Sequence, residues 1–427
     1  MKKPRSDFRS YLEFLGCPPL PPLTTAESRG RALLDHATAF VAGECGFAVA
    51  GESSSVPSDR GFAVAGHLFG DRRRLEQFLA VDDLGRALAD AMDHPVAPQA
   101  ATPVPHRERT DLDLRALGAF TLPGLPLADY LTSAVVFAPA GDADVNLSIH
   151  RARVDDATHL VLRVVPRHLH RLLAARGGRL RAALALGVDP AVSFAASVSL
   201  PGPGGELAVA GGLARSPVGL FTAHGLTLPA SFECLLIGEF TGETAPEGPF
   251  IDLTGTVDPV REQPLFRVDR MLVREHAVIP MILPSSPEHA LLMGLAREAG
   301  VGRALRPLYA DGLRVRLTAG GCGWLHCVVS GQSAAPAALL ADAAFAAHPS
   351  CKRLTLVDAD IDPDDAVAVE WALATRFQAD RDLLVRPGER GSTLDPSSDA
   401  GVTARWVLDA RCPTDRDYAL FTRLLDR

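Results

Sequence analysis

Two carboxylates flank a rigid turn in Pro246-Glu-Gly-Pro-Phe-Ile-Asp252, and they are the residues best suited to proton transfer. If the Gly-Pro turn brings Glu247 and Asp252 within about 4 Å, their repulsion is about 4 kcal/mol at an effective dielectric near 20. That repulsion raises the pKa of one carboxyl, which then stays protonated near neutrality and can act as a general acid. A solvated acidic loop is the alternative, and the spacing alone does not decide between the two.

Polar residues alternate with apolar ones in Val145-Asn-Leu-Ser-Ile-His-Arg151. On a strand this pattern places polar side chains on one face, which is either a binding face or an ordinary exposed one. Arg167, His168 and His170 follow at the expected start of a helix. Two histidines at i and i+2 diverge on a helix, so they do not form a paired-histidine metal site. A single metal-ligating histidine and an exposed basic helix start both remain open.

Two further segments contain residue types that are suited to ligand binding. Residues 194–206 are rich in Gly and Ser, which permit close backbone approach to a ligand but also form ordinary flexible turns. Asp358, Asp360 and Asp362 form an acidic cluster after an apolar run. Such a cluster can hold a cation, although it more often caps the next helix and pairs with arginines.

Composition restricts the classes of protein to consider. The 427 residues carry 43 Lys and Arg against 51 Asp and Glu, a formal charge of −8 that argues against a nucleic-acid partner. The basic start has no apolar stretch after it, and no run of about 18 apolar residues occurs, so neither a signal peptide nor a transmembrane helix is expected. Seven scattered cysteines without a CxxC pair predict neither a disulfide scaffold nor structural zinc. We therefore expect a cytoplasmic protein without a membrane partner.

The elements that must position these residues are a β-rich centre between α/β flanks. The expected helices are 7–15, 24–42 (beginning at Thr24 or Thr25), 71–92, 167–176, 364–375 and 415–427. The expected strands are Gly46–Gly51, Gly61–Gly66, 134–137, 145–149, 159–165, 205–210, 233–240, 313–317, 353–357 and 405–408. Residues 95–112 have the composition of a linker. We predict an N-terminal α/β segment (1–112), a central domain (113–304) and a C-terminal α/β domain (305–427).

Five segments in this order resemble motifs of the UbiD family of decarboxylases, which use prenylated FMN. The resemblance runs from about residue 66 to 411. Pro246–Asp252 is similar to the family's "P-E-G-P-F-G-[ED]", its most specific motif. The other four matching segments are Gly66–Arg72, Val145–Arg151, Pro190–Glu206 and Val357–Arg376.

The resemblance implies roles for individual residues. Asn146, His168 and Glu206 fall on the ligands of a divalent metal, Mn²⁺ or Mg²⁺, that bridges the flavin phosphate to the protein. Ala196, Ser197 and Ser199 fall on the turn that holds K⁺. The implied contacts of the prenylated FMN are Asn146, Ser148, Ile149, His150, Arg151, Arg167, His168 and, at the family's phosphate-binding lysine, Arg405. The implied catalytic set is Arg151, Glu247 and Asp252, with Glu247 delivering the proton.

The resemblance also implies a fold, a reaction and partners. The fold is a central split β-barrel that binds flavin, flanked by α/β segments, with the C-terminal domain forming a homodimer. The reaction is the reversible decarboxylation of an α,β-unsaturated or (hetero)aromatic carboxylic acid, with a flavin prenyltransferase supplying the cofactor. Two alternatives stay open: a UbiD-like enzyme that uses the flavin for cyclisation or redox chemistry, and a flavin-binding protein without catalysis.

Overall fold

The computed structural model describes residues 7–17, 19–23, 25–42, 62–141, 144–202, 204–413 and 415–422. These residues form two compact units. The first contains the described residues up to 84 together with 90–292, and the second contains 85–89 together with the described residues from 293 onwards. Each unit has its own sheets and its own core.

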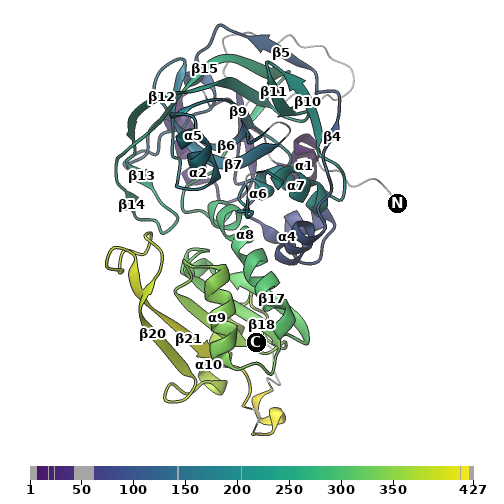
Figure 1. Ribbon diagram of the computed structural model, residues 1–427, viewed down its shortest axis with the longest axis vertical. Helices are drawn as coiled ribbons and strands as arrows, with labels where there is room; N and C mark the ends of the chain where they lie inside the picture. Colours follow the sequence, from purple (N-terminus) through teal and green to yellow (C-terminus); the bar gives the residue numbers. More distant parts are fainter. Residues whose placement is uncertain are drawn as a thin grey trace. The chain divides into compact units, whose positions relative to one another are not determined.

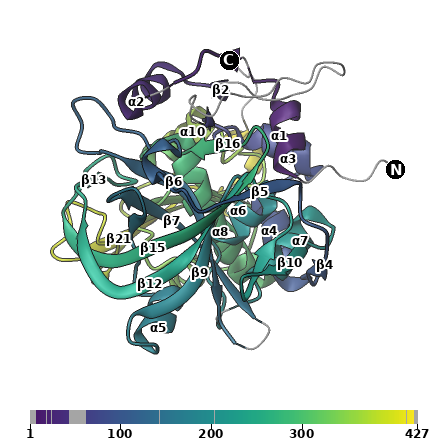
Figure 2. The same cartoon turned by 90° about the horizontal axis from the view of Figure 1, so that it is seen from above.

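A seven-stranded sheet forms the centre of the first unit. Its strands follow the order β12 (Cys234–Glu247), β9 (Arg179–Leu186), β6 (Tyr130–Pro139), β7 (Val145–Val154), β8 (His159–Leu162), β15 (Arg261–Arg274) and β5 (His106–Arg109). β12 also pairs with β15, so six of the strands close into a ring. The long β12 and β15 run beside each other in Figure 2. Five of the predicted site residues, Asn146 and Ser148 to Arg151, lie on β7 of this sheet, and Glu247 is the last residue of β12.

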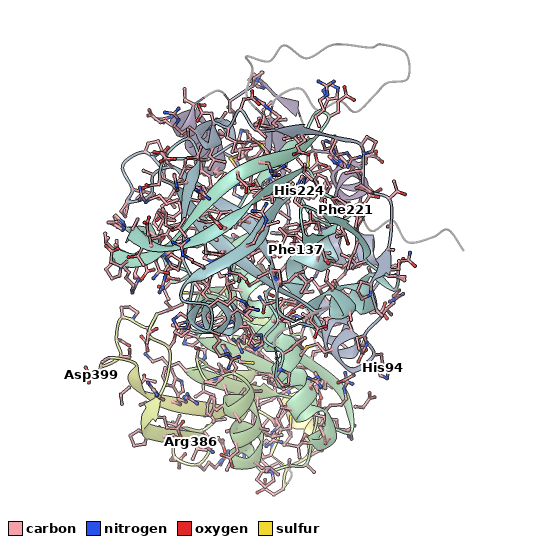
Figure 3. All side chains as sticks on the ribbon, turned by 45° about the horizontal axis from the view of Figure 1, so that its top comes forward. His94, Phe137, Phe221, His224, Arg386 and Asp399 are labelled. Atoms are coloured by element: carbon pink, nitrogen blue, oxygen red, sulfur yellow. The ribbon has the colours of Figure 1, made fainter. Side chains whose placement is uncertain are left out.

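The ring is filled by apolar side chains that alternate along its strands. Phe240 and Phe266 pack edge to face at 5.0 Å on one face of the sheet. Phe137, which Figure 3 labels on β6, is 1% exposed on the other face, where it lies beside Ala183 of β9. Burial of each large apolar side chain contributes about 1.5–3 kcal/mol, so the ring is a rigid platform for the polar residues on its strands.

Smaller sheets and helices surround this centre. One sheet has the order β1 (Pro19–Leu20), β2 (Phe40–Ala42), β3 (Ala63–Gly66), β16 (Val278–Met281); another has β11 (Leu226–Pro229), β10 (Gly219–Ala223), β4 (Gln99–Ala100); and β13 (Phe250–Ile251) pairs with β14 (Val257–Asp258). The helices are α1 (Phe8–Leu15), α2 (Ala26–Asp35), α3 (Arg72–Leu79), α4 (Leu84–Asp93), α5 (His168–Ala174), α6 (Pro190–Ala195) and α7 (Glu206–Ala214). Helix α8 (Pro287–Leu305) begins in the first unit and continues into the second.

The second unit is a five-stranded sheet with a helix on each face. The strand order is β17 (Asp311–Leu317), β18 (His326–Gln332), β19 (Arg353–Val357), β21 (Val402–Asp409), β20 (Leu383–Arg390), and the three central strands are parallel. Alternate residues of β19 face separate cores: Leu354 and Leu356 lie in the core of α9 (Ala337–Ala347), and Val357 lies in that of α10 (Ala366–Arg376). Figure 1 shows this unit in green and yellow, and Arg386 of β20, labelled in Figure 3, pairs with Asp342 of α9 at 2.6 Å.

The mixed α/β fold class is confirmed, and several predicted elements lie where expected. Helix α1 covers 8–15, and Thr25 is the N-cap of α2 through a capping box with Ser28. β19 covers 353–357 and α10 lies within the helix expected over 364–375, extended by one residue. The second Gly-bounded run contains β3, whereas Gly46–Gly51 lies outside the described residues.

Five predicted elements are wrong in kind or extent. The helix expected over 24–42 ends at Asp35, and Phe40–Ala42 is strand β2. Residues 206–214 are helix α7 rather than a strand over 205–210; the helix is buried nearly all round, so it shows no amphipathic period. The helix expected over 71–92 is two helices, because Ala80 adopts a left-handed conformation with φ of 53°. The predicted linker contains β4 and β5. The described part of the predicted C-terminal helix is only a 3₁₀ turn, Tyr418–Phe421.

Candidate active site

A buried ion pair joins β7 to the end of β12. The Nε of Arg151 donates to Oε1 of Glu247 at 2.9 Å, and its Nη2 donates to Oε2 at 3.1 Å. The Oη of Tyr130 donates to the same Oε1 at 2.7 Å and accepts the N–H of Gly248 at 2.9 Å. Glu247 is 0% exposed, so its charge depends on these three donors in place of water. The structure therefore brings together two of the three predicted catalytic residues.

A third carboxylate, which the sequence reasoning missed, completes this pair. Asp258 Oδ2 accepts from Arg151 Nη2 at 2.6 Å, and Asp258 Oδ1 accepts from Arg261. Hydrogen bonds and charge from Arg261 and Arg151 oppose the effect of burial and hold the pKa of Asp258 below its usual range. The guanidinium carbon of Arg151 also lies 3.9 Å from the centre of the Phe250 ring, a cation–π contact. Arg151 is thus fixed by two carboxylates and an aromatic face.

Asp252 lies near this network without pairing to it. Among the described residues neither Arg151 nor Glu247 makes a hydrogen bond or ion pair with Asp252; its Oδ1 accepts the N–H of Leu253 at 2.6 Å. Burial raises the pKa of Asp252, and the charge of Asp258 adds to the rise, while the Leu253 N–H and Arg151 oppose it. Asp252 is therefore the carboxyl of the site that retains a proton more readily than an ordinary aspartate.

The three predicted metal ligands come from β7, α5 and α7. Glu206, the first residue of α7, is 1% exposed, and its Oε1 lies 3.9 Å from Nδ1 of His168, the first residue of α5. The Nδ2 of Asn146 is buried without a hydrogen-bond partner. Burial raises the pKa of Glu206 to about 7. A desolvated carboxylate beside an imidazole fits a divalent cation that accepts oxygen and nitrogen ligands, and the side-chain oxygen of Asn146 would be its third ligand.

In the described ranges, no group of three or more His, Cys, Asp or Glu side chains is arranged so that it could hold a metal ion. This observation does not test the predicted set, because one of its three members is an asparagine.

The other β7 residues predicted to contact the cofactor include Ser148, Ile149 and His150. The side chain of His150 hydrogen-bonds to Ser148 of the same strand and to the residue that follows β8. His150 is buried, with Nδ1 2.8 Å from the carbonyl oxygen of Arg163 and Nε2 2.8 Å from Oγ of Ser148. Because a carbonyl only accepts, Nδ1 carries the hydrogen, and the Ser148 hydroxyl then donates to Nε2. Burial lowers the pKa of His150 to about 4, so the imidazole is neutral and keeps this arrangement. Ile149, between them, is half-buried.

The turn after α6 holds the predicted K⁺ residues. Ala196 is buried, and the Ser197 hydroxyl donates to the carbonyl oxygen of Phe194 at 2.7 Å. Ser199 is exposed, and its Oγ accepts from Nη1 of Arg167 at 3.2 Å. Two predicted cofactor contacts, the Arg167 side chain and this turn, therefore lie side by side.

Arg405 lies in the second unit. It is 6% exposed, donates to the carbonyl oxygens of Pro349 and Arg390, and pairs with Glu389 at 3.4 Å. Its predicted role at the flavin phosphate stays a prediction.

Comparison with known proteins identifies the chain. The model of the 3-octaprenyl-4-hydroxybenzoate carboxy-lyase Rift-related domain matches residues 96–287, and that of the C-terminal domain of the same carboxy-lyase matches residues 290–410. The chain belongs to the UbiD family. It is an enzyme of the carboxy-lyase class, as the sequence predicts.

Relatives and solved structures of this UbiD-family enzyme agree. An anhydromevalonate phosphate decarboxylase from Aeropyrum pernix is 37% identical over 369 residues, 82% of each chain. The UbiD-class enzyme HmfF from Pelotomaculum thermopropionicum in complex with FMN superposes with a TM-score of 0.86 at 28% identity, over 98% of this chain and 97% of that one. An evolved dimeric form of HmfF in complex with prenylated FMN gives 0.81 at 26%, over 97% and 96%. In the described part of the chain, no helix has the length and apolar character needed to span a bilayer.

Proposed function

We propose that this UbiD-family enzyme is a prenylated-FMN-dependent decarboxylase of an α,β-unsaturated or (hetero)aromatic carboxylic acid. The observation that carries the proposal is the buried Glu247–Arg151–Asp258 network beside the protonatable Asp252. Decarboxylation replaces a carboxylate by a proton, so it needs a proton donor held in a dry, ordered site. A flavin carrier has no need of such a set.

Asp252 suits the role of proton donor better than Glu247, to which the sequence analysis gives it. Glu247 accepts three hydrogen bonds, two of them from a guanidinium, so both of its oxygens are engaged by Arg151 and Tyr130. Asp252 has a raised pKa and is half-buried, so it can hold a proton and still face a ligand. We infer that Asp252 delivers the proton and that Arg151, fixed by its two carboxylates, orients the reacting acid.

Cofactor residues follow from the same strands. Asn146, His168 and Glu206 would hold Mn²⁺ or Mg²⁺, Ser148, Ile149 and Arg167 would contact the flavin, and the turn at 196–199 would hold K⁺. When bound, the prenylated flavin supplies an electron sink for the electron pair left by CO₂. The protein supplies orientation, exclusion of water and the proton.

The Aeropyrum relative favours the unsaturated acids within the proposed substrate class. That relative is named for decarboxylating anhydromevalonate phosphate, and the prefix "anhydro" denotes an acid that has lost water and is therefore unsaturated. We further propose that a flavin prenyltransferase supplies the cofactor, that the chain acts in the cytoplasm and that it forms homodimers.

The bound cofactor gives the test. We would co-express the chain with a flavin prenyltransferase, record the absorption spectrum, and measure the mass of the flavin released on denaturation. A prenylated FMN mass supports the proposal. Colourless protein that releases no flavin would refute it.

A further inference from the structure

A second arginine lies directly across the sheet from Arg151. β7 and β8 are antiparallel with Ala152 opposite Leu162, so Arg163, the residue after β8, lies opposite Arg151; its N–H donates to the Arg151 carbonyl oxygen at 3.1 Å. Like charges directly opposite each other in a ladder repel. Asp258 Oδ2 lies between them, 2.6 Å from Nη2 of Arg151 but 3.8 Å from Nε of Arg163. The shared carboxylate is thus hydrogen-bonded to Arg151 and only near Arg163.

Arg163 has donors without acceptors. Its side chain is 23% exposed and makes no hydrogen bond to any described residue. The acceptors around it are in use, because Arg261 takes Oδ1 of Asp258, and Arg151 takes Oδ2. The guanidinium groups of Arg151, Arg163 and Arg261 lie around two carboxylates, those of Glu247 and Asp258. When Asp252 is protonated, this group of side chains therefore carries one more positive than negative charge. The Arg163 guanidinium is partly exposed, so its free donors are accessible to an anion.

We propose that Arg163 binds a second anionic group of the substrate, a phosphate or a carboxylate that remains on the product. The inference rests on the proposed decarboxylation and names the class of acid: one with two anionic groups. The planar guanidinium matches either group through paired hydrogen bonds.

The departing carboxylate is the less suitable partner for Arg163. Loss of CO₂ moves negative charge away from that carboxylate, so a guanidinium paired to it would stabilise the reactant more than the transition state. An anionic group that stays on the product carries its charge throughout, and binding it orients the acid without slowing the reaction.

The flavin phosphate is also a less suitable partner. Arg151 lies five residues beyond Asn146 on β7, which at about 3.3 Å per residue places Arg163 roughly 16 Å from the predicted metal and phosphate end of the strand. The two anions would therefore bind at separate positions along β7.

Three saturated probes test this inference without turnover. They are unbranched acids of one chain length that end in a phosphate ester, a carboxylate or a hydroxyl group, and calorimetry measures their affinity for the flavin-loaded protein. We expect the protein to bind at least one of the two anionic probes about tenfold or more tightly than the hydroxyl probe, the scale of a charged hydrogen bond. Which of the two it prefers separates phosphate from carboxylate.

Arg163→Gln should abolish that preference, and Arg163→Lys should retain part of it. Arg181→Gln is the matched control, since Arg181 pairs with Asp269 elsewhere in the same unit at 2.8 Å and should leave the preference unchanged. Equal binding of all three probes by the unmodified protein, or an unchanged preference in Arg163→Gln, would overturn the inference. Selective binding without release of CO₂ from the matching unsaturated acid would refute the proposed function and leave the Arg163 site standing.

Discussion

Oδ2 of Asp258 lies 2.6 Å from Nη2 of Arg151, whose other hydrogen bonds go to Glu247. The second carboxylate that fixes Arg151 therefore comes from strand β14 and not from the motif residue Asp252. This relationship separates two tasks. Glu247 and Asp258 hold the guanidinium in place, and Asp252 is left to hold and deliver a proton.

Asp258→Asn should slow decarboxylation while the flavin stays bound. The amide keeps the shape of the side chain but removes the negative charge that pairs with Arg151, and loss of a charged hydrogen bond corresponds to about 10- to 100-fold in rate. The measurement is kcat together with flavin content by absorbance. Asp269→Asn, which removes the carboxylate paired with Arg181, is the control and should retain full activity. An Asp258→Asn enzyme with the unmodified rate would show that Asp258 does not position Arg151.

The rate should fall as pH rises through the raised pKa of Asp252. A proton donor works only when protonated, and burial raises this pKa, so the active form persists to higher pH than for an ordinary aspartate and is then lost. The pH profile of kcat and the incorporation of solvent deuterium into the product measure this behaviour. Asp252→Asn should lose both the alkaline limb and the deuterium incorporation. Retention of both in Asp252→Asn, with their loss in Glu247→Gln, would return the donor role to Glu247.

Tyr130→Phe should destabilise the protein by about 1–2 kcal/mol, because the phenol both donates to buried Glu247 and accepts the Gly248 N–H. Urea unfolding of the unmodified and variant proteins measures the difference. Tyr309→Phe is the control: the Tyr309 hydroxyl is buried without a hydrogen-bond partner, so its removal should cost little or stabilise. Equal losses in the two variants would contradict the role given to the Tyr130 hydroxyl.

His168→Ala should lose the divalent metal and the flavin together, since His168 would hold the metal with Asn146 and Glu206, and the metal would help the protein to bind the cofactor. Metal analysis and flavin absorbance of the purified variant measure both. His170→Ala, two residues further along α5 and exposed, should keep both. If His168→Ala retained metal and flavin, the proposed ligand set would be wrong.

The sequence predicts the residues of the site better than their partners. Arg151 and Glu247 belong to recognisable motifs, and the structure pairs them. Asp258 follows Asp252 by six residues in an undistinguished segment, and only the β13–β14 hairpin brings it to Arg151. Tyr130 lies 117 residues before Glu247 in the chain. Arg163 lies beside Arg151 only because β8 pairs with β7. The only sequence signal for Asp258 is weak: it follows Val257 shortly after the catalytic motif, and an acidic residue beside apolar ones can be buried.

In the fold, too, the elements with local sequence signals are predicted well, and the features that depend on distant residues are not. Helix α1 and strand β19 have local signatures and are predicted well. Helix α7 is buried nearly all round, so its sequence lacks the amphipathic period that would distinguish it from a strand. The closure of β12 on β15 depends on residues far apart in the chain, which no local pattern reports.

The central claim is decarboxylation that depends on the prenylated flavin, and release of CO₂ tests it most directly. Protein made with and without a flavin prenyltransferase would be incubated with a panel of α,β-unsaturated and (hetero)aromatic acids, and CO₂ would be measured against product. The account predicts equal amounts of CO₂ and decarboxylated product from at least one acid, only for protein made with the prenyltransferase. Flavin-loaded protein that converts an acid from the panel without releasing CO₂, or that releases CO₂ equally well without the prenylated flavin, would contradict it.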